Sequence, residues 1–226
     1  MNFKNKEIYN KDFKIDNNIA YFIGILHSDG CIYNLFDKKR DRKIIRLNLT
    51  IGKKSISMAL KFKKILFDYF NRTVNLRKVP NKNSYVIQTS INRIKHVLKN
   101  WNEKIPLEIK RDSSLFGAYL AGLIDGDGYI KLKNNTTDRI VPQCIIKIAS
   151  DHPMVDVKNS IISHIGCNVH FEYKKGNKGV DTCFYISKKS IGYIKNYIFP
   201  HIVIDYKLNT LEKFFNNKNT GLPGLS

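Results

Sequence analysis

Two apolar stretches of similar sequence recur along the chain, one in each half. The first is Ile19–Ile32, IAYFIGILHSDGCI, and the second is Gly117–Ile130, GAYLAGLIDGDGYI. Apolar residues surround each stretch on all sides, which is typical of a helix buried within a protein. Each helical stretch ends in Asp-Gly, a pair that favours the end of a helix. Because Asp29 and Asp127 occupy the same position of the repeat, the pattern predicts two equivalent carboxylates at two helix ends.

Alternating apolar and polar positions follow each of these helices and predict strands. Both halves repeat one order of segments. We expect strands from about residues 31 and 129, second strands around 46–51 and 146–149, helices from about 55 and 151, further strands at 74–76, 85–89, 169–173 and 183–186, and closing helices near 91–100 and 190–197. The predicted fold class is therefore α+β, with two pseudo-symmetric αββαββα repeats. Each repeat would be a curved four-stranded antiparallel sheet with helices on one face, and the repeats would join at the paired motif helices.

The period of about 100 residues indicates a duplicated domain. We expect an N-terminal half over residues 1–105, a linker over 106–114, and a C-terminal half over 115–226 that includes a helical tail near 208–215. No apolar run reaches about 18 residues, so no membrane-spanning helix is predicted.

Small residues recur at every fourth position of both motif helices. They are Ala20, Gly24 and Ser28 in the first copy and Ala118, Gly122 and Gly126 in the second. Positions i, i+4 and i+8 share one face of a helix, and a face without side chains lets two helices approach closely. Glycine in a helix costs about 1 kcal/mol relative to alanine, so its repeated use favours direct pairing of the two helices. Such pairing would bring Asp29 and Asp127 together, a repulsion that a divalent cation such as Mg²⁺ relieves.

The composition points to a polyanionic partner. Lysine and arginine number 39 against 19 aspartates and glutamates, which gives a net charge of +20. Contacts with phosphates supply most of the affinity of basic proteins for nucleic acids. A lysine-rich solvated surface is the alternative explanation of this charge. The four cysteines form no CxxC pair, so we predict no zinc site and no disulfide framework, and we expect an intracellular, reducing compartment.

The second motif, LAGLIDGDG at Leu120–Gly128, resembles the nine-residue motif of the LAGLIDADG homing endonucleases at every position except Gly126. The first, FIGILHSDG at Phe22–Gly30, is a degenerate copy that keeps the glycine and the final Asp-Gly. The resemblance implies a single-chain, two-repeat monomer, often encoded in an intron. It also implies hydrolysis of both strands of a long double-stranded DNA target with a divalent metal, leaving short 3′ overhangs.

The resemblance implies roles for particular residues. Asp29 and Asp127 would bind metal and activate hydrolysis, with the main-chain carbonyls of Ser28 and Gly126 as further ligands. Basic or polar residues would assist: Lys53 after the second strand of half one, Ser150 or Asp151 in the matching place of half two, and Lys110 and Lys207 late in each half. His27 replaces the first motif acid, a position that is usually structural. Because half two lacks a basic residue matching Lys53, the two strands are expected to be cut at unequal rates.

Polar residues that alternate with the core positions of the strands would face DNA. The candidates for base contacts are Tyr33, Arg46, Asn48, Asn75 and Arg77 in half one and Tyr129, Lys131, Lys133, Gln143 and Lys147 in half two. The candidates for contacts from loops, mainly with phosphates, are Lys38, Lys39, Arg40, Arg42, Lys43 and Arg139.

The expected cofactor is Mg²⁺, for which Mn²⁺ or Ca²⁺ could substitute in binding, and the expected partner is double-stranded DNA. Two other functions remain open. One is an RNA maturase or a non-cleaving DNA-binding protein on the same scaffold, and the other is an unrelated basic RNA- or ribosome-associated protein. The two intact acids favour the enzyme, because a protein that only binds nucleic acid gains nothing from two unpaired carboxylates.

Overall fold

The computed structural model describes residues 14–37, 39, 41–90, 104–133, 143–177, 179–187 and 189–216. The first half contains α1 (Asn17–His27), β1 (Gly30–Asp37), β2 (Arg42–Gly52), a 3-10 turn (Lys53–Ser55), α2 (Ile56–Phe70), β3 (Leu76–Lys78) and β4 (Ser84–Ser90). The second contains α4 (Leu107–Arg111), α5 (Ser113–Asp127), β5 (Gly128–Lys133), β6 (Gln143–Ser150), α6 (Val155–Ile165), β7 (Val169–Tyr173), β8 (Val180–Ile186), α7 (Ile191–Tyr193), a π-helical turn (Ile194–Ile198) and α8 (Asp205–Phe215).

The two sheets have the same topology. Their strand orders are β1-β2-β4-β3 and β5-β6-β8-β7, and all neighbouring strands are antiparallel. Gly30 lies opposite Leu49 and Gly128 opposite Ile148, so β1 and β5 begin at corresponding points. The predicted α+β fold with two four-stranded antiparallel sheets is confirmed. The closing helix expected near 91–100 lies outside the described residues.

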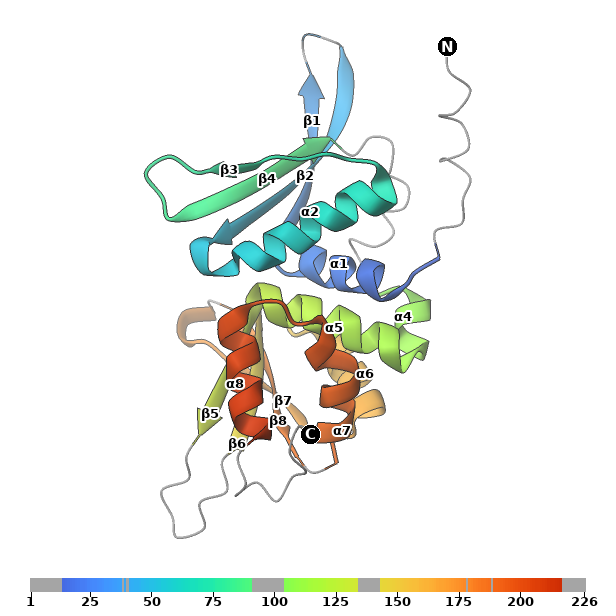
Figure 1. Ribbon diagram of the computed structural model, residues 1–226, viewed down its shortest axis with the longest axis vertical. Helices are drawn as coiled ribbons and strands as arrows, with labels where there is room; N and C mark the ends of the chain where they lie inside the picture. Colours follow the sequence, from blue (N-terminus) through green and yellow to red (C-terminus); the bar gives the residue numbers. More distant parts are fainter. Residues whose placement is uncertain are drawn as a thin grey trace.

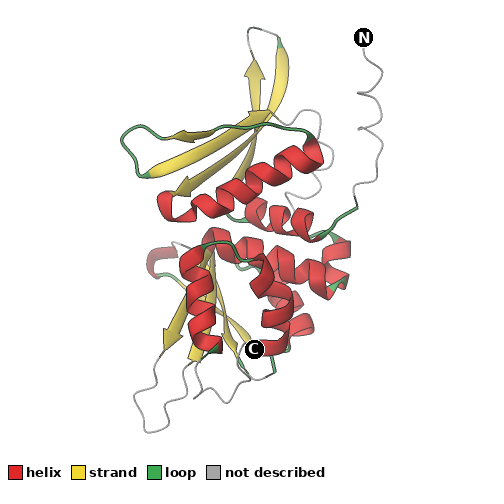
Figure 2. Cartoon of the chain, viewed as in Figure 1, coloured by secondary structure: helices red, strands yellow, loops and turns green. Residues whose placement is uncertain are grey.

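Helices α1 and α5 lie side by side at the centre of the molecule, between the two halves (Figure 1). Figure 2 shows the sheets at opposite ends, each with helices packed against it. The motif helices are buried from Ile19 to Leu26 and from Phe116 to Asp125. Among the described residues, no helix combines the length and the apolar composition needed to cross a membrane.

The glycines of the predicted stripe lie at the contact between these helices. A Cβ atom on Gly24 would lie 2.2 Å from the carbonyl oxygen of Tyr119, and one on Gly122 would lie 2.2 Å from the carbonyl oxygen of Tyr21. Both atoms belong to backbone, so no side chain could turn aside to make room. The pairing expected from the small residues is confirmed.

Matching aspartates begin the two motif helices. The Asp16 side chain accepts a hydrogen bond from the Ile19 amide, and Asp112 accepts one from Leu115, both at 2.9 Å. Such N-caps satisfy amides that have no partner inside the helix. The second motif helix therefore begins at Ser113, and residues 107–111 form α4. The segment expected to be a linker is thus largely helical.

Candidate metal centre and nucleic-acid interface

Each motif acid stands where its helix gives way to a strand. Helix α1 ends at His27 with Ser28 as its cap, and Asp29 follows, whereas Asp127 is the last residue of α5. The glycine after each acid is required by close packing. A Cβ on Gly30 would lie 2.7 Å from Leu26 Cα, and one on Gly128 would lie 2.3 Å from the Ile124 carbonyl oxygen. The φ of Gly128 is −82°, so steric space and not a left-handed conformation accounts for this Asp-Gly pair.

The ends of the two helices meet at the predicted metal position. A Cβ on Gly126 would lie 2.0 Å from Ser28 Oγ and 3.6 Å from the amide nitrogen of Asp29. Ser28 Oγ contacts the carbonyl oxygens of Gly24 at 3.1 Å and Ile25 at 3.2 Å, which holds its side chain against its own helix. The missing side chain of Gly126 therefore allows the end of α5 to reach the segment that carries Asp29.

Both acids carry the electrostatic mark of this arrangement. Burial, followed by the charge of Asp127, raises the pKa of Asp29 to about 6, and Lys207 opposes the rise. Partial loss of hydration also raises the pKa of Asp127, where Lys207 and Lys174 oppose the rise and Asp151 adds to it. A divalent cation would relieve this repulsion. Two carboxylates beside the helix-end carbonyls of Ser28 and Gly126 form an all-oxygen donor set, which fits Mg²⁺ or Ca²⁺.

Lys207 on α8 fixes the end of α5 from inside. Its side chain is 1% exposed, and its Nζ donates to the carbonyl oxygens of Ile124 at 2.5 Å and Asp125 at 2.8 Å. These helix-end carbonyls have no partner within the helix, so Lys207 acts as a C-cap. Burial lowers the pKa of Lys207 to about 8, although Asp125, Asp29 and Asp127 oppose that shift. Its charge thus lies behind the acid pair while its amino group is held by backbone.

A reciprocal hydrogen-bond pair, absent from the sequence-based prediction, links the two helices. The hydroxyl of Tyr21 on α1 donates to Asp125 Oδ2 on α5 at 2.7 Å, and the hydroxyl of Tyr119 on α5 lies 3.0 Å from His27 Nδ1 on α1. Asp125 is fully buried and also accepts the amide of Val203 at 2.9 Å. The signal was present in the sequence, because an Ala-Tyr pair occupies the same place in both motif copies.

A second buried-face lysine, Lys61 on α2, was also missed. Its Nζ donates to the carbonyl oxygen of His201 at 3.0 Å and lies 3.6 Å from the centre of the Tyr21 ring. It therefore connects the first half to the segment that leads into α8. Burial lowers its pKa to about 8, against the attraction of Asp125.

The remaining predicted active-site residues fall in different places. Lys110 lies before α5 begins, and its Nζ contacts Asp156 Oδ2 at 2.5 Å. A 15-residue helix is about 22 Å long, so Lys110 is at the opposite end of α5 from Asp127. The expectation that Lys110 joins the acids is not supported, because the residues around it form α4 and not a late strand or loop. Lys53 and Asp151 follow β2 and β6, which extend past the starts of β1 and β5 to the end where the acids lie.

The strand register places most predicted DNA-contact residues of half one on a common face. Tyr33 pairs with Arg46, and Asn48 pairs with Gln88, so these four side chains share the sheet face opposite the core residue Leu47. Gln88 Nε2 donates to the Tyr33 hydroxyl at 3.0 Å. Gln88 was missed in the sequence because only the strand register shows that it lies beside Tyr33 and Asn48. The exposed candidates from half one are Lys39, Lys43, Asn75 and Arg77.

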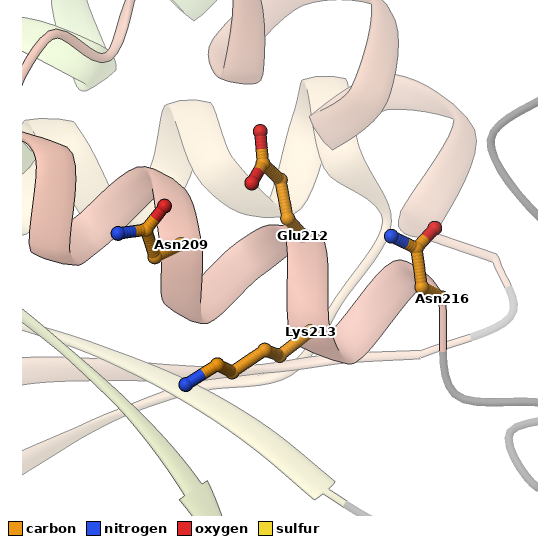
Figure 3. Close-up of a pocket in the computed structure, with 4 residues that line it drawn as sticks. All are labelled: Asn209, Glu212, Lys213 and Asn216. Carbon is orange, nitrogen blue, oxygen red and sulfur yellow. The ribbon is translucent and has the colours of Figure 1, made fainter.

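The second sheet has a similar face, which carries Tyr129, Lys131 and Lys147. Lys147 is paired with Glu172 there. Some candidates cannot be placed: Lys38, Arg40 and Arg139 lie outside the described residues, as do the side chains of Arg42, Lys133 and Gln143. A hollow on α8 lined by Asn209, Glu212, Lys213 and Asn216 contains none of the predicted residues (Figure 3).

No protein-family model and no curated protein sequence matches this chain. Solved structures do match it. The homing endonuclease I-DmoI, in complex with DNA and Ca, aligns with a TM-score of 0.63 and 17% identity over 87% of this chain and 97% of that one. The LAGLIDADG homing endonuclease I-LtrWI bound to target DNA aligns with a TM-score of 0.58 and 17% identity over 89% of each chain. A double mutant of I-SmaMI aligns with a TM-score of 0.58 and 14% identity over 92% and 95%. The chain therefore has the fold of the LAGLIDADG homing endonucleases.

Proposed function

We propose that this chain is a divalent-metal-dependent endonuclease that hydrolyses both strands of a long double-stranded DNA target and leaves short 3′ overhangs. One observation carries the proposal: two equivalent carboxylates, Asp29 and Asp127, lie at the meeting ends of two paired helices and perturb each other's surroundings. The relatives in fold support it. I-DmoI has been solved with its DNA in the presence of Mg, Ca and Mn, and I-LtrWI with its target DNA.

The residues of the centre divide the work. Asp29 and Asp127, with the main-chain carbonyls of Ser28 and Gly126, would hold Mg²⁺. When bound, Mg²⁺ neutralises phosphate charge and lowers the pKa of water for attack on the phosphodiester. Lys207 holds the end of α5 in position, and Lys174 and Asp151 set the charge around Asp127. Lys53 stands at the same end of its sheet and is available to a backbone phosphate.

DNA would lie across the outer faces of the two sheets. Arg46, Asn48 and Gln88 form a polar cluster on the first sheet that matches the pairing preferences of guanine and adenine in the major groove. Lys39 and Lys43, near the β1–β2 turn, suit phosphate contacts. The net charge of +20 supplies the general attraction that holds a polyanion on these faces.

Cleavage of a DNA library tests the proposal. The protein is incubated with Mg²⁺ and a pool of sequences, cut ends are captured, and the recovered target is used to compare variants. Asp29→Asn and Asp127→Asn should each slow cleavage by roughly a hundredfold or more, since each removes charge needed in the transition state. Asp68→Asn is the control, because Asp68 pairs only with Lys64 on the surface of α2 in the described structure.

Two further measurements make the result decisive. Thermal unfolding shows whether each variant is folded, and binding to the target with Ca²⁺ shows whether it still recognises DNA. Cleavage that survives in both aspartate variants would overturn the assignment. Specific binding by the wild-type protein without any cutting would instead identify an RNA maturase or a DNA-binding protein on this fold.

A further inference from the structure

Three side chains with metal-binding atoms gather on the outer face of the second sheet, away from the motif acids. His170 and Glu172 are two residues apart on β7, so both point to one face. Cys183 lies directly opposite His170 on the neighbouring strand β8. His170 Nε2 is 3.2 Å from Glu172 Oε1, and the potential ligand atoms of all three residues lie within 4.8 Å of one another.

We propose that His170, Glu172 and Cys183 form a zinc site. One thiolate, one imidazole and one carboxylate are the donors that zinc takes, and three protein ligands plus water form its usual open tetrahedral arrangement. Ligands at 2.0–2.3 Å in a tetrahedron are about 3.3–3.8 Å apart, so only small side-chain rotations separate the present arrangement from a bound one. This soft donor set differs from the all-oxygen centre at Asp29 and Asp127, which suits magnesium.

The surroundings support a built site. Cys183 is fully buried beneath the other two side chains, each of which is a little under half exposed, so an ion could enter from solvent. The Tyr185 ring stacks on the His170 imidazole with centroids 6.1 Å apart and an interplanar angle of 18°, which holds the ring upright on the strand. Ligands carried on two hydrogen-bonded strands are held more precisely than ligands on loops.

Lys147 occupies part of this site in the absence of metal. It lies opposite Cys183 on β6, and its ammonium group is paired with the Glu172 carboxylate. A zinc ion and the ammonium group are two cations that compete for one carboxylate. Zinc would therefore displace Lys147, and removal of the lysine charge would strengthen zinc binding.

Strand register explains why the sequence gave the opposite expectation. The absence of CxxC pairs predicted that there is no zinc site, because cysteines close in sequence are the usual signal. Here the ligands come from an His-x-Glu on one strand and a single cysteine ten residues further on. Only the antiparallel pairing of β7 with β8 brings them together.

Cobalt titration of the full-length protein, freed of metal with a chelator and desalted, tests the site. Co²⁺ should produce a thiolate-to-metal absorption band that saturates at one ion per chain, and Zn²⁺ but not Mg²⁺ should abolish it. Cys183→Ser should remove the band, and His170→Gln should weaken binding by tenfold or more. Lys147→Gln should instead tighten binding severalfold, which a merely structural role would not produce.

Two controls separate this site from other thiols and from the proposed nuclease centre. Cys31→Ser removes an exposed thiol on the first sheet and should leave the band unchanged. The double variant Asp29→Asn, Asp127→Asn should also keep it, whether or not the chain proves to be a nuclease. Circular dichroism verifies that each variant is folded. Absence of the band in folded wild-type protein, or its survival in Cys183→Ser, would refute the site.

Discussion

Single residues of the motif helices are held in environments that their charge does not favour. Asp125 is buried in the helix interface, where Tyr21 and the amide of Val203 satisfy one of its oxygens. Asp29 is partly buried next to a second acid. Buried or crowded carboxylates that function does not require are normally lost from a protein core, since each one costs stability. Asp125 is explained by its bond across the interface, but Asp29 has no comparable structural partner among the contacts described above.

The raised pKa of Asp29 makes a prediction about stability. The native pKa of about 6 exceeds the ordinary value of 3.8, so the native state binds the extra proton between these values and loses stability as pH rises through them. In metal-free protein at pH 7.5, we expect Asp29→Asn to increase the free energy of unfolding by about 2 kcal/mol. The gain should vanish near pH 4, where the wild-type acid is also neutral. Chemical denaturation at both pH values measures it.

Metal should reverse the order of the two proteins. With millimolar Mg²⁺ at pH 7.5, the wild-type protein gains stability by binding, whereas the asparagine variant lacks a ligand and gains less. Asp68→Asn, on the surface of α2, serves as the matched control and should show neither effect. Equal stability of wild type and Asp29→Asn at pH 7.5 without metal would contradict the raised pKa.

At the scale of elements, the glycine stripe decides how the helices pair. A Cβ at Gly24 or Gly122 would lie 2.2 Å from a backbone oxygen of the other helix. The helices would have to separate to accommodate it, which would also stretch the bonds between Tyr21 and Asp125 and between Tyr119 and His27. Because the motif acids stand at the ends of these helices, the spacing of the pair also sets the spacing of the acids.

We therefore expect Gly122→Ala to destabilise the protein by about 1–3 kcal/mol or more, as overpacking of a core does. The matched control is Gly192→Ala in α7, where a Cβ would meet nothing within 4 Å. That change should be neutral or stabilising by up to about 1 kcal/mol, since alanine favours helix. Thermal and chemical unfolding compare the two variants. If Gly122→Ala were as stable as Gly192→Ala, close helix pairing would be wrong.

The limits of the sequence-based prediction also appear at the scale of elements. The repeat, the strand alternation and the small-residue stripe were local signals, and they gave the fold and placed Asp29 and Asp127 at the helix pair. The positions of Gln88, Lys61 and Cys183 depend on strand register or on packing between halves, which local patterns do not contain. Lys110 was misplaced for a similar reason: its neighbours form the short helix α4, which turns the chain before α5 begins.

The whole molecule is symmetric in topology and asymmetric in charge. Both sheets share one strand order, yet the surroundings of the two motif acids differ. Asp127 is exposed and experiences Lys207, Lys174 and Asp151, whereas Asp29 is more buried and experiences mainly Asp127 and Lys207. If each acid serves the cleavage of one DNA strand, these differences affect the two strands separately.

The two strands of the target should therefore be cut at unequal rates. On a supercoiled plasmid that carries the recovered target, nicked circles should accumulate before the linear product, and end-labelled strands should give two different rate constants. Lys174→Gln should slow only the strand served by Asp127, by roughly two- to fivefold, because a nearby surface charge contributes about 0.4–1 kcal/mol. Lys64→Gln on α2 is the matched control and should change neither rate. Equal rates for the two strands, or an equal effect of Lys174→Gln on both, would show that the charge asymmetry around the acids has no consequence for cleavage.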